Sequence, residues 1–204
     1  MTSSKKSKNF KTKAMTWKTI FNPFEKYDEK TLFIVGIAFL ILLIPIGYWT
    51  NAYFTSIYRI SYLEESNLYD IIAPTLISFV STIIVLYLLG VILYRKTRII
   101  DIVNTVLISQ IPIILLLSTE KIHYIKNVGD RVRIYQENPS IAFPFLDFVI
   151  LMLVIFITLG SLIYSFVLFY NGFKTATNIK KWQHITLFCV VTFLTVVICQ
   201  IFNN

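Results

Sequence analysis

The chain has few of the residues from which metal and redox sites are built. Its 204 residues include two cysteines and two histidines. His123 and His184 fall in separate segments, which argues against a multi-histidine metal centre within one chain. Cys189 and Cys199 lie on one predicted helix, where their separation of about 15 Å is too large for an intramolecular disulfide. We therefore expect no metal site and no bound cofactor.

The sequence also lacks the motifs of common soluble enzymes. It contains no phosphate-binding loop, no HExxH motif and no dinucleotide-binding glycine pattern. The two longer segments between apolar runs, residues 50–70 and 119–142, are too short to form separate domains. No pattern places a nucleophile, a base and an electrophilic stabiliser together. These absences predict a protein that is not an enzyme, and we expect no nucleic-acid partner.

Long apolar runs are abundant instead. Hydrophobic residues make up 56% of the chain, and the mean hydropathy is +0.69. A transmembrane helix needs about 20 mostly apolar residues, because the hydrocarbon core is about 30 Å thick. The sequence therefore predicts an all-α, polytopic membrane protein with five transmembrane helices in a bundle. The expected spans contain no Lys or Arg and cover residues 31–49, 71–94, 99–118, 143–170 and 183–202.

The distribution of basic residues predicts how the helices are oriented. Fourteen of them precede the first span or follow the second and fourth spans, whereas five lie in the other connecting segments. Because positively charged loops stay on the cytoplasmic side, we predict a cytoplasmic N-terminus and a C-terminus outside. The chain then divides into a basic cytoplasmic tail, residues 1–30, and a five-helix membrane domain, residues 31–204.

The end of this tail has a helical apolar pattern. Trp17, Ile20, Phe21 and Phe24 recur at the spacing of one helix face. Pro23 interrupts that pattern, because a proline inside a helix removes a hydrogen bond. We predict a short amphipathic element in two pieces that lies on the inner leaflet. For the lysines before it we favour a solvated tail with ordinary positive-inside bias, and the alternative is a segment dedicated to anionic lipid.

Polar residues run along the third span. On a helical wheel Asp101, Thr105 and Pro112 cluster, and Asn104 and Ser109 flank them. Such a stripe must face protein or water, because unpaired polar groups are costly in hydrocarbon. Three interpretations remain open: helix packing, a path for a polar substrate or ion, and a partner site. We favour packing, because short hydrogen-bonding residues commonly join membrane helices.

Two further patterns concern contact surfaces. Small residues at spacings of three and four predict close helix packing in the second and fourth spans. The segment "YNGFKTATNIKKW" predicts a compact basic turn, with Gly172 able to adopt turn geometry. Together with the amphipathic element it gives a candidate membrane-surface or partner face. The small residues are Ser78, Thr82, Thr158, Ser161 and Ser165, and the face comprises Trp17, Phe21, Phe24, Gly172, Lys174, Lys180 and Lys181.

Three stretches also give the chain a family resemblance. These are "TWKTIFNPFEKY" before the first span, "SQIP" in the third, and "IYSFVLFYNGFKTATNIKKWQHI" between the fourth and fifth. In their order the chain resembles the Yip family, membrane proteins named for interaction with Ypt/Rab GTPases, and particularly its short bacterial branch. Ser109, Pro112, Tyr170 and Gly172 match these features. The resemblance implies five helices, a cytoplasmic N-terminus, a role in organising membranes and no catalytic residue to carry over.

The predicted function is therefore that of a noncatalytic integral membrane protein that organises the membrane or partner proteins. The alternative is a small transporter or permease component with a polar path along the third helix. We expect the lipid bilayer as one partner, with a membrane protein or a second copy of the chain as another. Richness in Ile, Lys, Asn, Phe and Tyr favours a bacterial inner membrane, and a eukaryotic chain would instead lie in the Golgi or endoplasmic reticulum.

Overall fold

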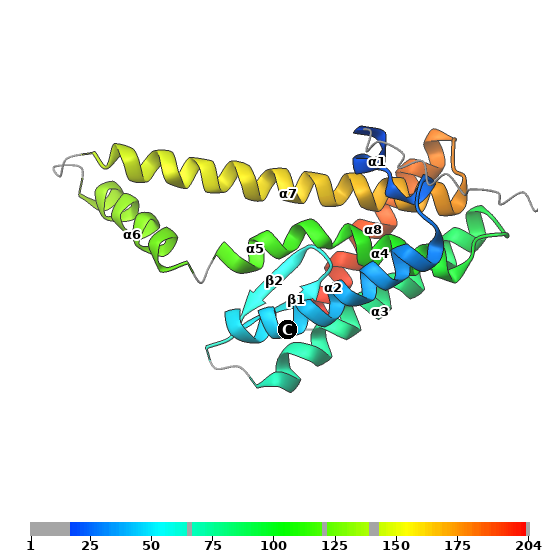
Figure 1. The fold of residues 1–204 in the computed structure, drawn as a ribbon, viewed down its shortest axis with the longest axis horizontal. Coiled ribbons are helices and arrows are strands. Elements are labelled where there is room, and N and C mark those ends of the chain that lie inside the picture. The colour runs from blue at the N-terminus through cyan, green and yellow to red at the C-terminus, as the bar shows by residue number, and fades with distance from the viewer. Residues whose placement is uncertain (1–16, 65–66, 120–121, 139–142, 203–204) are drawn as a thin grey trace, which may run out of the picture.

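The computed structural model describes residues 17–64, 67–119, 122–138 and 143–202, and the lysine-rich tail before Trp17 lies outside these ranges. It contains five helices that are long and apolar enough to cross a membrane, which confirms a helical protein of the membrane type. Figure 1 shows their arrangement. They are α2 (Glu29–Thr50), α3 (Leu68–Leu93), the third span (Ile99–Leu117), α7 (Phe145–Thr177) and α8 (Trp182–Phe202).

The third span is not one continuous helix. It consists of α4 (Ile99–Ser109), the 3-10 turn η2 (Ile111–Ile113) and α5 (Ile114–Thr119). Pro112 lies in the turn, and a proline has no backbone N–H and clashes with the preceding turn of an α-helix. The α-helical hydrogen bonding is therefore interrupted at the middle of the span.

A β-hairpin lies between α2 and α3, in the segment 50–70, which the sequence predicts only as a connection between two spans. α2 is followed by Asn51, whose left-handed conformation (φ 54°) turns the chain back. Strands β1 (Ala52–Ser56) and β2 (Arg59–Tyr62) then pair antiparallel. The helical prediction omitted this element.

Strand β1 is buried among the helices. Phe54 N donates to Thr75 Oγ1 at 3.2 Å, and Ser78 Oγ donates to Phe54 O at 2.9 Å. Ala52 and Phe54 are each 1% exposed. Backbone groups inside a membrane protein need hydrogen-bond partners, and these two hydroxyls of α3 supply them. The hairpin is therefore an integral part of the bundle.

A helical arm extends away from the other helices. It consists of α6 (His123–Glu137) and the N-terminal half of α7, as Figure 1 shows. Val128 is fully buried, and α6 packs along α7. Arg131 Nε and Nη2 donate to Asp147 of α7 at 2.5 and 2.7 Å. The segment 119–142, expected to be a loop, therefore contains a helix that covers the beginning of α7.

Most of the small residues that the sequence analysis named for helix packing are buried. Ser78, Thr82, Ser161 and Ser165 are buried, whereas Thr158 is half-buried. α4 lies in the middle of the bundle, in contact with α2, α3 and α7. Small side chains let backbones approach closely, which increases the van der Waals attraction between helices in lipid.

The amphipathic element forms two pieces, as predicted. These are α1 (Trp17–Phe21) and the 3-10 turn η1 (Pro23–Glu25). Both pieces contact α7, so the segment lies along the bundle immediately before α2 begins. Pro23 occupies the start of η1, where its missing N–H costs no intrahelical hydrogen bond.

Candidate functional site

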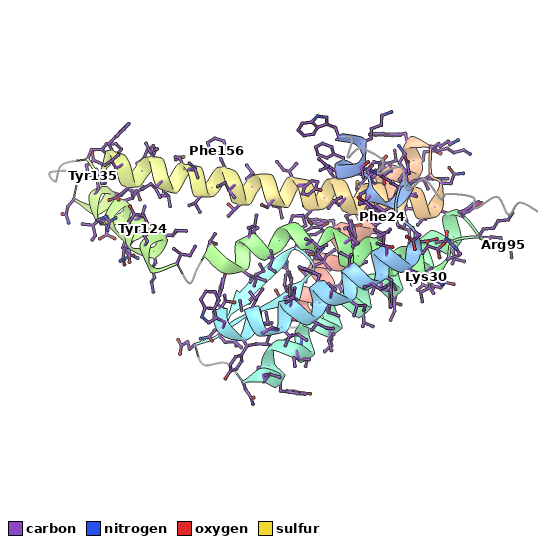
Figure 2. All side chains as sticks on the ribbon, in the orientation of Figure 1. Phe24, Lys30, Arg95, Tyr124, Tyr135 and Phe156 are labelled. Atoms are coloured by element: carbon purple, nitrogen blue, oxygen red, sulfur yellow. The ribbon has the colours of Figure 1, made fainter. Side chains whose placement is uncertain are left out.

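Two groups of polar side chains lie in different parts of the bundle. The first is at the basic end, by which we mean the end that carries α1, η1, the start of α2 and the α3–α4 and α7–α8 turns. Figure 2 shows Phe24, Lys30 and Arg95 in this region. The second group lies in the interior, on the hairpin, at the break of the third span, and on α7 and α8.

A pocket of about 280 Å³ opens at the basic end between η1, α2, α4 and α7. Three carboxylates, one guanidinium and one amide provide its charged and most polar groups. We call it the acidic pocket, because the carboxylates outnumber the guanidinium. These five residues are Asp28, Glu29, Arg98, Asp101 and Asn104.

Arg98 links two of the carboxylates. Its Nη2 contacts Glu29 Oε1, and its Nε and Nη2 each donate to Asp101 at 3.1 Å. The hydrogen bond with Glu29, followed by that with Asp101, raises the pKa of the Arg98 guanidinium above its ordinary value. The Arg98 side chain is 58% exposed, so water screens these pairs and they orient side chains more than they stabilise the fold.

Asp28 is held differently. Its Oδ1 accepts a hydrogen bond from Thr31 Oγ1 at 2.6 Å, and this bond is the main cause that lowers the pKa of the Asp28 carboxyl. Asp28 is therefore ionised at neutral pH. The pocket thus presents negative charge within an end of the molecule that is otherwise basic.

The predicted polar stripe begins at this pocket. Asp101 and Asn104 line it, and Asn104 Nδ2 donates to the Glu29 carbonyl at 3.1 Å. Asn104 Oδ1 is buried and has no hydrogen-bond partner in the described part of the chain. Thr105 is fully buried, donates to the Asp101 carbonyl at 2.7 Å and lies against Gly172 of α7. This half of the stripe therefore joins α4 to α2 and α7.

The other half of the stripe lies in different surroundings. Ser109 is buried and donates to the Val106 carbonyl at 2.9 Å. Pro112 lines a separate surface cavity with Ile20 and Tyr164. The five stripe residues are thus distributed over a pocket, a packed interface and a second cavity.

The N-terminal segment is fixed to α7 by two hydrogen bonds. Tyr164 Oη donates to the Ile20 carbonyl at 2.9 Å, and Asn171 Nδ2 donates to the Phe21 carbonyl at 2.8 Å. The ring of Phe21 also packs edge-on against Tyr164, with 5.8 Å between ring centroids. Trp17 nevertheless remains 78% exposed and Phe21 43% exposed. The segment therefore presents two aromatic side chains from a fixed backbone.

The other members of the predicted face separate into buried and exposed residues. Phe24 turns inward and lies against Gly172. The expectation of a turn at Gly172 is wrong, because α7 continues to Thr177 and Gly172 is a buried contact point within the helix. The chain turns later, at Asn178, which has a left-handed conformation (φ 48°). The three lysines of the face are exposed: Lys174, Lys180 and Lys181.

The interior group consists of those side chains away from the basic end that have a buried polar atom with no hydrogen-bond partner among the described residues. Tyr58 follows β1 at the tip of the hairpin, and its ring stacks on Phe166 with 4.0 Å between centroids. The Tyr58 hydroxyl lies beside that of Ser165 without a well-formed hydrogen bond between them. Gln110 is fully buried at the break of the third span. The group is Ser56, Tyr58, Gln110, Ser165 and Thr192.

The sequence pattern does not predict this group as a site. Gln110 gave a signal, because a glutamine inside an apolar span needs polar surroundings. It lies off the predicted stripe and was therefore not chosen. Ser56 and Tyr58 gave none, because their burial depends on how the hairpin packs against helices distant in sequence.

Within the described ranges there is neither a preformed metal site nor a disulfide bond. No three His, Cys, Asp or Glu side chains there come close enough to hold a metal ion. Cys189 is exposed and Cys199 is buried, and both are free thiols.

Comparison with protein-family models, curated proteins and solved structures found no match. The resemblance to the Yip family therefore stays a prediction.

Proposed function

We propose that the protein is a noncatalytic integral membrane protein that works by binding, with its basic end in the cytoplasm as the working surface. Following the Yip-like resemblance, it organises the membrane or partner proteins, a second copy of the chain among them. Its proposed location is the inner membrane of a bacterium, where it is a multi-pass protein. The split of basic residues between the two ends supports this orientation.

The exposed aromatic pair on the N-terminal segment carries this proposal. Trp17 and Phe21 are exposed although the backbone of their helix is held by Tyr164 and Asn171 of α7. Because this backbone is already held in place, binding through these side chains does not have to order the segment, which favours association. Large aromatic side chains also provide much of the energy at protein interfaces and membrane surfaces.

The charges beside this pair define what it would contact. Exposed Lys174, Lys180 and Lys181 lie at the same end of the bundle and would attract anionic lipid headgroups. Aromatic residues combined with lysines are typical of elements that bind in the plane of a membrane surface. The acidic pocket would add a second contact for a cationic group of a partner.

A small transporter is the second candidate, and the interior supports it. The third span is interrupted at Pro112, and a hairpin enters the bundle. Discontinuous helices and non-helical backbone inside a membrane commonly accompany substrate sites. The break also carries a buried glutamine, Gln110, whose side-chain oxygen has no hydrogen-bond partner among the described residues.

A paired substitution tests the binding proposal. The double variant Trp17→Ala, Phe21→Ala removes the exposed aromatic pair and leaves the packed Phe24 in place. The matched control is Tyr48→Ala, Trp49→Ala, because these residues are 48% and 62% exposed at the opposite end of α2. We would measure recovery of partner proteins in mild detergent and association with vesicles that contain anionic lipid.

Loss of recovery or of vesicle association in the first variant alone supports the proposal. Equal behaviour of wild type and both variants, with each protein correctly inserted, would reject the basic end as the working surface. Flux of a polar solute into liposomes, abolished by Gln110→Leu, would then favour the transporter.

A further inference from the structure

Among the described residues that line it, the acidic pocket has an excess of negative groups and of hydrogen-bond acceptors. Asp28, Glu29 and Asp101 contribute carboxylates, and Arg98 contributes a guanidinium. Asn104 extends the imbalance, because it is 2% exposed and its Oδ1 has no hydrogen-bond partner in the described ranges. A buried acceptor normally has a partner. The lining therefore favours a ligand that is a cation and carries N–H donors.

The arrangement suits an organic ammonium group better than a metal ion. In the described part of the chain no three acidic, histidine or cysteine side chains come close enough to hold a metal ion. The carboxylates instead line an open pocket of about 280 Å³. They are accessible to a ligand, since the side chains of Glu29 and Asp101 are 45% and 23% exposed. An ammonium group has three N–H bonds, which can reach oxygens on different side chains.

Arg98 adds an anion-binding group beside the carboxylates. Its contacts with Glu29 and Asp101 use Nε and Nη2, which leaves Nη1 for a ligand. The side chain is 58% exposed, so a ligand in the pocket can reach it. Guanidinium groups pair well with phosphate. The pocket can therefore contact a zwitterion, with its ammonium at the carboxylates and its phosphate at Arg98.

A mainly apolar cavity of about 200 Å³ lies beside the acidic pocket, and Tyr27 lines both. The apolar cavity reaches Ile108 and Ile111 of the third span, and Ile108 is about 10 Å farther along α4 than Asp101. The two cavities thus follow one another from the end of the bundle towards its middle. A phospholipid has its headgroup and its acyl chains in the same order.

We propose that the two cavities together bind one phospholipid with an ethanolamine headgroup. Its ammonium contacts the carboxylates of Asp28 and Asp101, its phosphate contacts Arg98, and one acyl chain lies in the apolar cavity. A lysine of a partner protein would use the carboxylates but neither Arg98 nor the apolar cavity, so the lipid accounts for more of the structure. The site rests on the proposed function, in which the basic end lies at the cytoplasmic surface of the membrane.

Binding of a labelled lipid tests this site. The full-length protein in mild detergent is titrated with radiolabelled phosphatidylethanolamine. The unlabelled competitors are phosphatidylcholine, whose ammonium has no N–H bond, and phosphatidylglycerol, which has no cation. We expect saturable binding of the ethanolamine lipid. Both competitors should bind at least about tenfold more weakly, because neither can donate a charged hydrogen bond to the carboxylates.

Single substitutions test the carboxylates. Asp28→Asn and Asp101→Asn each remove one negative charge and keep the side-chain shape, so both variants should fold. Each should weaken binding of the ethanolamine lipid by about tenfold and should not weaken binding of phosphatidylglycerol. Asp130→Asn on α6 is the matched control, because Asp130 also pairs with an arginine three residues away, Arg133, but lies outside the pocket.

A cavity-filling variant tests the position of the acyl chain. Ile111→Trp places a large ring in the apolar cavity and should weaken binding of the ethanolamine lipid. Leu115→Trp is the control, because Leu115 belongs to the same span, is 48% exposed and lines neither cavity. Melting temperatures in detergent confirm that both variants are folded.

Three results would overturn the proposal: no saturable binding, wild-type affinity in both aspartate variants, or a soluble trilysine peptide that binds as tightly as the lipid and is unaffected by Ile111→Trp. The last result would assign the pocket to a protein partner. The double variant Trp17→Ala, Phe21→Ala leaves the lining of both cavities intact. It should still bind the ethanolamine lipid even if it no longer associates with anionic vesicles, so failure of this site and failure of the proposed function are distinguishable.

Discussion

The third and fourth spans are both apolar enough to cross a membrane, yet they occupy opposite environments. In the most apolar window of the third span 56% of the residues are buried inside the protein, against 6% in α7. The third span therefore contacts protein on most sides, and much of α7 is left for lipid or for another chain. Apolar composition indicates that a segment enters a membrane but does not indicate what surrounds it there.

The polar residues of the third span account for its deeper burial compared with α7. The third span carries Asn104, Ser109 and Gln110, whose polar groups require protein around them. In α7 the buried residues begin only at Ser161, and the preceding half has large exposed side chains such as Phe156, which points away from the bundle in Figure 2. The same helix thus passes from an exposed arm into the core.

The largest expected effect concerns whether the two spans cross the membrane in opposite directions. In a variant with Cys189 and Cys199 replaced by Ala, Asn138→Cys should react with an impermeant maleimide in intact cells. Lys180→Cys should react only after the membrane is opened, because the basic segments stay inside. The labelling is all-or-none, and the reverse pattern would invert the proposed orientation and move the working surface outside.

A pair of core and lipid-facing substitutions tests the contrast in burial. Ile102 of α4 is 0% exposed and Ile163 of α7 is 55% exposed. Ile102→Ala leaves a cavity and should lower the free energy of unfolding by about 2–4 kcal/mol. Ile163→Ala should cost less than about 1 kcal/mol, because lipid can fill the space. Unfolding in mixed micelles measures both, and equal losses would contradict the assignment of their surroundings.

A pair of glycines in α7 sharpens the comparison within one helix. A Cβ on Gly172 would lie 2.6 Å from Thr105 Oγ1, whereas a Cβ on Gly160 would meet nothing within 4 Å. Gly172→Ala should therefore push α4 from α7 and destabilise the protein by about 1–3 kcal/mol. Gly160→Ala should be neutral or stabilising by up to about 1 kcal/mol, because alanine favours the helix. The melting temperatures in detergent should move in opposite directions or differ clearly, and equal shifts would argue against tight packing at Gly172.

The sequence predicted the helices well because apolar length is a local property. All five spans were located, and the two-piece element at Trp17–Glu25 was anticipated from Pro23. The hairpin was missed because its burial depends on Thr75 and Ser78, which lie beyond it in the chain. Whether α7 would end near Tyr170 or continue also depended on packing, since Gly172 is accommodated only because Thr105 and Phe24 cover it.

The candidate sites were predictable only in part, for a related reason. Asp101 and Asn104 were selected because polar residues in an apolar run need an explanation, and both line the acidic pocket. The other carboxylates of the pocket, Asp28 and Glu29, come from the start of the first span, far from the third span in the sequence. A single helical wheel shows which side chains share a face, but it does not show which other elements complete the pocket.

The smallest expected effect concerns Asp101, where the packing and transport interpretations of the third span differ. Asp101→Asn keeps an acceptor for Arg98, and Asp101→Leu removes it, yet Arg98 is exposed and retains Glu29 in both variants. Thermal stability in detergent should therefore decrease from wild type to Asp101→Asn to Asp101→Leu, and the Asp101→Asn variant should be barely less stable than wild type. The other polar anchor of α4, Asn104 on the Glu29 carbonyl, remains in each case and serves as the internal reference. The contrary outcome is that Asp101→Asn keeps wild-type stability but abolishes a proton or ion flux measured in liposomes. The carboxylate would then be part of a relay, and conduction rather than helix packing would explain the polar residues of the third span.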